Sequence, residues 1–125
     1  MPKKFSDQTI KIAELKSLLK KFRDARSWEQ FHTPKNLASA ISIESAELME
    51  HFLWKTEKKS DAFLKDPANA QKVQEELADI VCYCLNLANV LDIDVSKAVK
   101  DKIDKNGKKY PVNKSKNNAR KYTEF

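Results

Sequence analysis

ISIESAELMEHFLW, residues 41–54, is the stretch that decides the fold, because it sets two carboxylates within an otherwise apolar helical pattern. Glu44 and Glu47 stand three residues apart, so a helix with about 3.6 residues per turn projects both from one side. Apolar residues flank that sector and continue round the back, which predicts a buried helix. Buried carboxylates are costly unless they are compensated, so the pattern predicts that cations or protons accompany them.

A second acidic pair with the same spacing lies further along the chain. Glu76 and Asp79 are also three residues apart, and Glu76 adjoins an apolar stripe. The connector between the two helical stretches is long enough for them to lie antiparallel, so we expect the two pairs to face each other. Four converging carboxylates repel one another unless a divalent metal binds, and oxygen ligands favour Mg²⁺ or Mn²⁺ over zinc.

Two other polar residues near the first pair have competing interpretations. His51 lies close to the carboxylate sector and is a candidate ligand, although a packed or hydrogen-bonded histidine is the favoured interpretation. Glu50 is interpreted as a solvent-facing acid, with an outer-shell role as the alternative. Neither residue is included in the predicted metal site.

Hydrophobic periodicity predicts four helices and no strand, and hence an all-α, four-helix bundle-like fold. Thr33, Asp66 and Asp94 are predicted N-caps, and proline follows the first two. Gly107, the only glycine, is predicted to end the last helix in a left-handed conformation. The predicted helices cover 7–26 with Ser6 as N-cap, 34–55, 67–91 and 95–106, with a short turn at 62–64 and an irregular tail after Pro111.

Composition limits the classes of partner. The 125 residues are divided into a helical domain, 1–111, and a basic C-terminal tail, 112–125. Residues 108–125 hold six Lys or Arg and one Glu, so they carry +5 of the net charge of +6. Because the positive charge belongs to a tail and not to a patch on the helical domain, a nucleic-acid partner is not favoured.

With no apolar run of about 18 residues and no signal-peptide core, we expect a cytoplasmic protein with no membrane partner. Cys82 and Cys84 are expected to be reduced thiols rather than zinc ligands.

The predicted helix at 34–55 has more apolar surface than three neighbours in a small chain can cover. Such surface is typical of a subunit interface. We therefore expect a homo-oligomer, a dimer or a tetramer with active sites between subunits, in which the helices of one subunit complete the core of another.

At these residues the sequence resembles the MazG-like all-α nucleoside triphosphate pyrophosphohydrolases, and within them the dCTP pyrophosphatase subgroup. Glu44, Glu47, Glu76 and Asp79 meet the family pattern of E-x-x-E followed by E-x-x-D, with 28 residues between the pairs. The resemblance covers nearly the whole chain. It extends to WEQFHTPKNL at 28–37, Trp54-Lys55, Glu75-Glu76-Leu77, Tyr83, Lys102, Asn106, Tyr110-Pro111 and RKYTE at 120–124.

The resemblance implies hydrolysis of a (deoxy)nucleoside triphosphate, dCTP or a modified dCTP, to the monophosphate and pyrophosphate, as in sanitation of the nucleotide pool. It implies that the four acids hold Mg²⁺, with Mn²⁺ as a possible substitute. We assign Glu47 as the carboxylate that orients or deprotonates the attacking water. The residues expected to bind the nucleotide or its phosphates are Trp28, Glu29, Gln30, Phe31, His32, Trp54, Tyr83, Lys102, Asn106 and Tyr110.

Three observations qualify the implied substrate and the residues expected to bind it. Leu19 stands where the dCTP-preferring relatives carry a base-contacting histidine, so a strict preference for cytosine does not follow from the resemblance. Aromatic rings beside a metal site suit a stacked base, yet for Trp28, Trp54 and Tyr83 core packing is the favoured interpretation on the residues alone. Lys102 and Asn106, one turn apart, are placed to reach phosphate oxygens, and a solvated helix face explains them equally well.

Three alternatives remain open at this point. The same fold could act on another nucleotide, such as dUTP or a phosphoribosyl nucleotide. The chain could be a non-catalytic, nucleotide-binding helical interaction protein. The basic tail could bind nucleic acid, although a role in bracing an oligomer or facing phosphate ranks above it.

Overall fold

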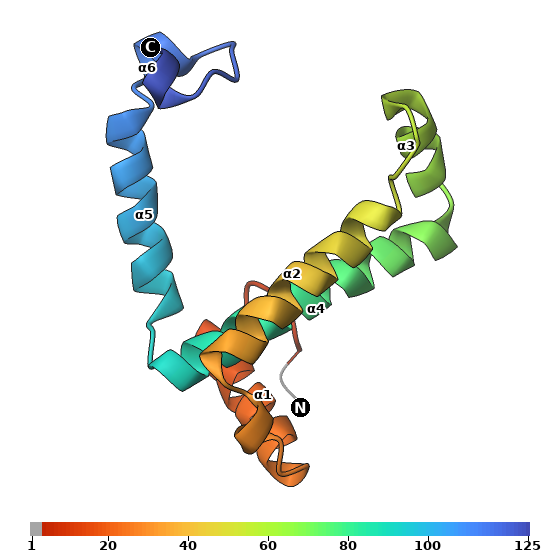
Figure 1. The fold of residues 1–125 in the computed structure, drawn as a ribbon, viewed down its shortest axis with the longest axis vertical. Helices are drawn as coiled ribbons and strands as arrows, with labels where there is room; N and C mark the ends of the chain where they lie inside the picture. The colour runs from red at the N-terminus through yellow and green to blue at the C-terminus, as the bar shows by residue number, and fades with distance from the viewer. Residues whose placement is uncertain (1–3) are drawn as a thin grey trace. The chain divides into compact units, whose positions relative to one another are not determined.

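The computed structural model describes residues 4–125, and over that range it contains helices and no strand (Figure 1). The prediction of an all-α fold is confirmed. The helices are, in chain order, α1 (Ile12–Ala25), η1 (Glu29–Phe31), α2 (Pro34–Glu50), α3 (Glu57–Leu64), α4 (Pro67–Leu91), α5 (Val95–Lys109), α6 (Val112–Ser115) and η2 (Tyr122–Glu124), where η marks a 3₁₀-helix.

The chain divides into two compact units, one ending at Asp92 and the other comprising Ile93–Phe125. In the first unit α2 runs antiparallel to α4 and beside it, and α1 and α3 also contact α4 (Figure 1). The buried apolar side chains of this unit are Leu37, Leu85 and Ala88. Helix α4 is therefore the element against which the first unit is built.

The three predicted N-caps, Thr33, Asp66 and Asp94, are confirmed. Each side chain accepts a hydrogen bond from a backbone amide in the first turn of its helix, which satisfies a donor that the helix itself leaves free. The bonds are Asn36 N to Thr33 Oγ1 at 3.2 Å, Ala68 N to Asp66 Oδ1 at 2.9 Å and Lys97 N to Asp94 Oδ1 at 3.0 Å.

Helix α1 begins later than predicted, at Ile12 instead of residue 7. The expected N-cap, Ser6, lies in a separate turn that is closed by a bond from the Thr9 amide to its carbonyl at 3.0 Å. The cap of α1 is Lys11, whose backbone amide donates to the Glu14 carboxylate at 2.6 Å. The prediction missed this start because the bond is made by an acid at the third helical position.

Helix α2 ends at Glu50, five residues before the predicted end. Residues 51–53 tighten into bonds between each amide and the carbonyl three residues earlier, and Trp54 adopts a left-handed φ of 65°. The Lys55 ammonium donates to the His51 carbonyl at 2.6 Å and so satisfies one of the free carbonyls at this end. The predicted turn at 62–64 belongs instead to α3, which begins after an N-cap at Thr56.

In the second unit the prediction for Gly107 is wrong. This glycine lies inside α5, which continues to Lys109, and no glycine has a positive φ. The helix ends at Lys109 with Tyr110 as its C-cap, because a residue that precedes proline is disfavoured in helical conformation. The exposed pairs Lys97–Asp101 at 2.7 Å and Lys100–Asp104 at 2.6 Å support the helix locally.

The segment after Pro111 is more ordered than predicted. It contains α6 and η2, and its last aromatic residues pack on Tyr110. The rings of Tyr122 and Phe125 each meet the Tyr110 ring edge-on, with centroids 5.8 Å apart. Aromatic contacts between residues distant in the sequence therefore organise a tail that lacks helical periodicity.

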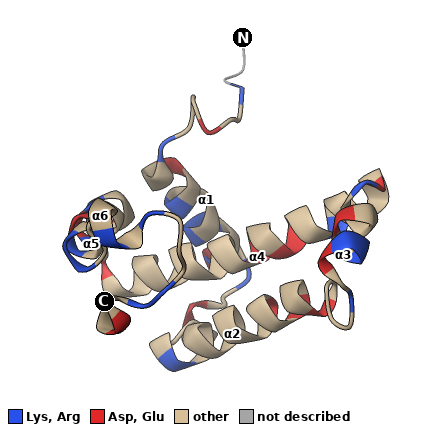
Figure 2. Cartoon of the chain, turned by 90° about the horizontal axis from the view of Figure 1, so that it is seen from above, with Lys and Arg blue, Asp and Glu red and all other residues tan. Residues whose placement is uncertain are grey.

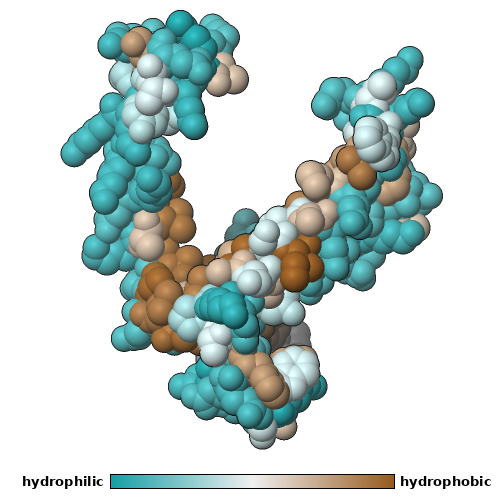
Figure 3. Space-filling model, in the orientation of Figure 1, coloured by the Kyte–Doolittle hydropathy of each residue, from teal (hydrophilic) through white to brown (hydrophobic). Residues whose placement is uncertain are grey.

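Helix α2 is not buried all round in the single chain, and it keeps the uncovered apolar surface that was expected of it; the second copy that would cover this surface stays a prediction. Ile43 is 58% and Met49 59% exposed, and exposed apolar side chains also occur on α4 at Leu77 and Val81. Figure 3 shows such apolar surface (brown) along this part of the molecule. Among residues 4–125, no helix combines the length and apolar character needed to cross a membrane.

Candidate active site

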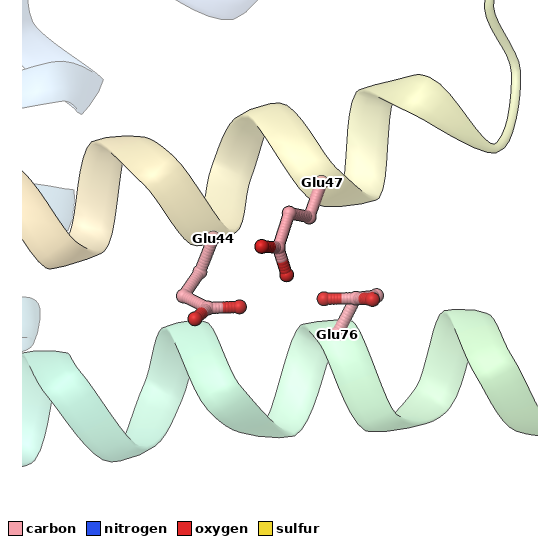
Figure 4. Close-up of side chains that lie close together, drawn as sticks. All are labelled: Glu44, Glu47 and Glu76. Carbon is pink, nitrogen blue, oxygen red and sulfur yellow. The ribbon is translucent and has the colours of Figure 1, made fainter.

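Three of the four predicted acids converge between α2 and α4. Glu44 and Glu47 extend from α2 and Glu76 from α4, and their carboxylates point toward one another (Figure 4). One ligand oxygen from each lies within 4.8 Å of the others. The antiparallel packing of the two helices brings Glu76, one member of the second pair, to face Glu44 and Glu47, and Figure 2 shows acidic residues (red) on both helices toward the α3 end.

Asp79, the fourth predicted acid, lies one turn further along α4. It is not part of the group of three, but its negative charge contributes to raising the pKa of Glu44. Asp79 also lines the cavity described below. The acids therefore form a cluster of three with Asp79 between the cluster and the cavity.

The electrostatics of Glu44 show how closely the acids approach. Burial raises the pKa of Glu44 to about 7, with further contributions from a hydrogen bond to Glu47 and from the charges of Glu47, Asp79 and Glu76. The Oε2 atoms of Glu44 and Glu76 are buried and have no hydrogen-bond partner among the described residues. Two half-buried carboxylates with free oxygens form an arrangement that a proton or a cation stabilises.

His51 lies at the edge of the cluster, where α2 ends. Its Nε2 is 3.6 Å from Glu76 Oε1, and its ring is 6.1 Å from that of Phe63 on α3. A packed histidine was the interpretation favoured from the sequence, and the ring of Phe63 provides such packing; a role as metal ligand stays untested. His51 is placed to orient the Glu76 carboxylate.

Beside the cluster lies a cavity of about 700 Å³ between α1, η1, α2 and α4. Its wall is mainly apolar and aromatic, and Asp79 and Tyr83 belong to it at the side of the acids. Burial and the charges of Glu44 and Asp79 raise the pKa of the Tyr83 phenol, so this group stays neutral. The lining residues are Leu19, Phe22, Trp28, Phe31, His32, Asn36, Leu37, Ala40, Asp79, Cys82, Tyr83 and Asn86.

A turn at the end of α1 builds the aromatic wall. The Ser27 amide donates to the Asp24 carbonyl at 3.1 Å and the Trp28 amide to the Arg23 carbonyl at 3.0 Å, with Ser27 in the left-handed region at φ 53°. This pattern is a Schellman motif, which is usually accompanied by an apolar contact across the turn. Here Trp28 meets the Phe22 ring edge-on, with centroids 5.9 Å apart.

His32 is the polar residue at the junction of η1 and α2. Burial and the nearby Arg23 guanidinium lower its pKa, which favours the neutral imidazole. Its Nδ1 is buried and has no partner among the described residues. Arg23 itself is held by Asp24, with Nη2 2.8 Å from the carboxylate.

The structure places the predicted nucleotide-binding residues in different surroundings. Trp28, Phe31, His32 and Tyr83 line the cavity, whereas Glu29 and Gln30 do not, and Trp54 is 92% exposed beyond the end of α2. The remaining three belong to the second unit, where Tyr110 packs against its neighbours in the tail. For the residues outside the cavity wall, substrate contact stays a prediction; those of the second unit are Lys102, Asn106 and Tyr110.

Several cavity residues were missed by the sequence analysis. Asn36 lines the wall and donates to the Phe31 carbonyl at 3.0 Å, which ties η1 to α2. Asn86 lies seven residues after Asp79, so the two share a face of α4, but the spacing of one asparagine from one acid is too weak a signal to identify it from the sequence. The other missed residues, Phe22, Leu37, Ala40 and Cys82, are apolar or weakly polar positions that resemble ordinary core.

Residues 39–125 match the MazG-like family. The chain belongs to the MazG-like family. It is 37% identical to dCTP pyrophosphatase 1 of Mus musculus over 124 residues, which is 99% of this chain and 72% of that protein. It is also 37% identical to dCTP pyrophosphatase 1 of Homo sapiens over 114 residues, which is 91% of this chain and 67% of that protein.

A solved structure of a pyrophosphatase is also similar to this chain. The crystal structure of a pyrophosphatase from Archaeoglobus fulgidus superposes with a TM-score of 0.76 at 42% sequence identity, covering 86% of this MazG-like chain and 99% of that chain. The expected enzyme class, a nucleoside triphosphate pyrophosphohydrolase, is confirmed by these similarities.

Proposed function

We propose that the protein hydrolyses dCTP or a modified dCTP to the monophosphate and pyrophosphate with the help of Mg²⁺. One observation carries the proposal: the acid cluster adjoins an aromatic cavity, and Asp79 and Tyr83 belong to the wall between them. A nucleotide has the same two-part chemistry, with an anionic triphosphate at one end and a flat base at the other. The similarity to dCTP pyrophosphatases supports cytosine as the base.

The residues present fit a divalent metal. Glu44 and Glu76 each have a buried oxygen without a partner among the described residues, and every donor of the cluster is a carboxylate oxygen. Hard oxygen donors suit Mg²⁺, with Mn²⁺ as a substitute. The proposed ligands are Glu44, Glu47, Glu76 and Asp79. A bound Mg²⁺ would supply neutralisation of the triphosphate charge and acidification of water.

The chain's own groups have distinct proposed tasks. Glu47 is the exposed member of the cluster, so it is placed to accept a proton from the water that attacks the α-phosphorus in line as pyrophosphate leaves. Its hydrogen bond to Glu44 fixes the carboxylate in the cluster. His51 orients Glu76 from the other side. Trp28 and Phe31 hold the base by stacking, with water excluded by the apolar wall.

We also propose that the active species is a homo-oligomer. Ile43, Met49, Leu77 and Val81 leave apolar surface on both helices that carry the acids. Covering this surface with a second copy would complete the core around the cluster. Light scattering at micromolar concentration tests this, and a monomer under those conditions contradicts it.

A panel of nucleotides with Mg²⁺ is the experiment that tests the function. dCTP, 5-methyl-dCTP, dUTP and a phosphoribosyl nucleotide are each incubated with the protein, and pyrophosphate and orthophosphate are measured separately. We expect pyrophosphate and dCMP from dCTP. Orthophosphate release would contradict attack at the α-phosphorus, and tight nucleotide binding without turnover would instead support a non-catalytic binding protein.

A further inference from the structure

Asn86 is a buried polar residue whose side chain has no evident role in holding the fold together. It is 8% exposed, and its side chain makes no hydrogen bond to another described residue. The other buried polar residue among residues 4–125, Arg23, is paired with Asp24. Its amide atoms are not among the fully buried groups without a partner, so they keep access to the cavity that Asn86 lines. A carboxamide with no partner in the protein is free to pair there with a polar group of a ligand.

The position of Asn86 relative to the acids suits a nucleotide. Asp79, Tyr83 and Asn86 follow one face of α4 along the cavity wall. With a rise of about 1.5 Å per residue, Asn86 lies roughly 10 Å along the axis from Asp79. That distance is comparable with the one from the α-phosphate of a nucleotide to the polar edge of its base. A triphosphate at the acids therefore brings the base to Asn86.

Few other residues at this end of the cavity offer a polar group that could pair with a base. Leu19, Phe22 and Trp28 offer apolar surface and stacking, but none of them presents a hydrogen-bonding group matched to a base edge. Discrimination between bases requires a paired polar group in the site. His32 contributes a second such group, since its Nδ1 is buried without a described partner.

We propose that Asn86 is a base-recognition residue, whose carboxamide pairs with the Watson–Crick edge of a pyrimidine in the cavity. This inference rests on the proposed function. The amide presents a donor beside an acceptor, and cytosine offers the complementary pair in its N4 amino group and N3. Uracil offers the reverse order, which the amide matches after a half-turn. Asn86 thus recognises the pyrimidine edge, and its surroundings set the choice between the two bases.

The test compares substrates with and without a base. Wild-type protein and Asn86→Leu, with Asn86→Ala as a smaller alternative, are assayed with Mg²⁺ on dCTP, on dUTP and on 2′-deoxyribose 5′-triphosphate, which lacks a base. We expect kcat/KM for the better pyrimidine substrate to fall roughly ten- to a hundredfold. The value for the base-free compound should stay within about threefold of the wild-type value, because the missing contact is made only to the base. An equal loss on all substrates, or no loss on any, overturns the proposal.

A second measurement keeps the proposal separate from the catalytic function. Binding of dCMP is measured by calorimetry without metal, and Asn86→Leu is expected to weaken it by a similar factor. If the wild-type protein releases no pyrophosphate from any nucleotide, the proposed function fails. The role of Asn86 is judged separately: it is overturned if the wild-type protein does not bind dCMP, or if Asn86→Leu binds dCMP as tightly as the wild-type protein does.

Asn89→Ala is the matched control. Asn89 lies one turn further along α4, is not part of the cavity wall, and donates to the Lys16 carbonyl at 3.0 Å. Its removal should lower the melting temperature and leave the ratio of kcat/KM between dCTP and the base-free compound unchanged. A change in that ratio as large as the one for Asn86→Leu would overturn the specific role of Asn86.

Discussion

The candidate site has an acid end, the cluster with Asp79, and an aromatic end, the cavity beside it, and these two ends are built in different ways. At one end, acids from two long antiparallel helices meet, and regular helical spacing sets their positions. At the other end, aromatic side chains come from the last turn of α1, from a left-handed turn at Ser27 and from the short helix η1. The first end is polar and titratable, and the second is almost entirely apolar.

This difference suggests that the acid end controls the rate of hydrolysis and the aromatic end controls the choice of nucleotide. Two packed helices hold one oxygen of each of the three acids within 4.8 Å of the others, and the proposed metal binding depends on that geometry. The aromatic end depends on turns and on side-chain packing, which tolerate substitution more readily. We therefore expect changes at the acid end to affect turnover and changes at the aromatic end to affect substrate preference.

Loss of an acid should have the largest effect. Glu47→Gln removes the proposed base and a proposed metal ligand while keeping the size of the side chain, so kcat should fall by roughly 10²- to 10⁴-fold. Asp79→Asn should behave similarly. Glu50→Gln, on the same helix but outside the cluster, is the control and should retain wild-type activity. Near-wild-type turnover in Glu47→Gln would refute the proposed mechanism.

Metal should stabilise the fold in a pH-dependent way. The pKa of Glu44 in the folded protein is about 7, above its ordinary value of 4.5, so between these pH values the folded chain binds more protons than the unfolded chain. Without metal, stability contributed by Glu44 should therefore be lost as pH rises from about 4.5 to about 7. Mg²⁺ binds the deprotonated acids, so its stabilisation should increase over the same range.

Thermal unfolding with Mg²⁺ or with EDTA at pH 5 and pH 8 measures this. At a Mg²⁺ concentration of a hundred times Kd, the stabilisation at pH 8 should be about 2.7 kcal/mol. The effect at pH 5 should be smaller. A stabilisation that is equal at both pH values would argue against binding at Glu44.

At the aromatic end, Trp28→Ala should mainly raise KM. Loss of one stacking ring is worth about 1–3 kcal/mol, or roughly 5- to 150-fold. Trp28→Phe keeps a ring against Phe22 and should recover most of the loss. A large fall in kcat with unchanged KM would place Trp28 in the chemistry and contradict the separation of the two ends.

The turn at Ser27 should give the smallest effect. Serine in the left-handed region is strained and glycine is not, so Ser27→Gly should stabilise the protein by about 1 kcal/mol and raise Tm by a few degrees. Ser39→Gly, inside α2, is the opposite control and should destabilise by about 0.5 kcal/mol. A lower Tm for Ser27→Gly would show that the serine side chain stabilises the turn.

The acid end could be predicted from the sequence because helices convert spacing into position. An interval of three residues placed Glu44 beside Glu47, and the caps at Thr33 and Asp66 fixed where the two helices begin. The end of α2 could not be predicted, since it depends on one lysine that reaches the His51 carbonyl. Local bonds of this kind leave no periodic signal.

The aromatic end was predicted only in part. The resemblance indicated Trp28, Phe31 and Tyr83, but Asn86 was missed because a single asparagine in an apolar stripe has no spacing pattern of its own. The order of the tail was missed for a related reason, since Tyr110 meets Tyr122 and Phe125 across many residues of sequence. The number of subunits, the metal and the compartment stay predictions.

The Schellman turn ties Trp28 to Phe22, so the last part of α1 and the aromatic wall form one body. That body is joined to α4 by packing and by the bond from Asn89 to the Lys16 carbonyl. The residues that line the aromatic end of the cavity are therefore fixed to α1, whereas the acids are carried by α2 and α4. We therefore expect that a few substitutions where α1 contacts α4 could change the base preference of a related protein without changing the bond that is hydrolysed.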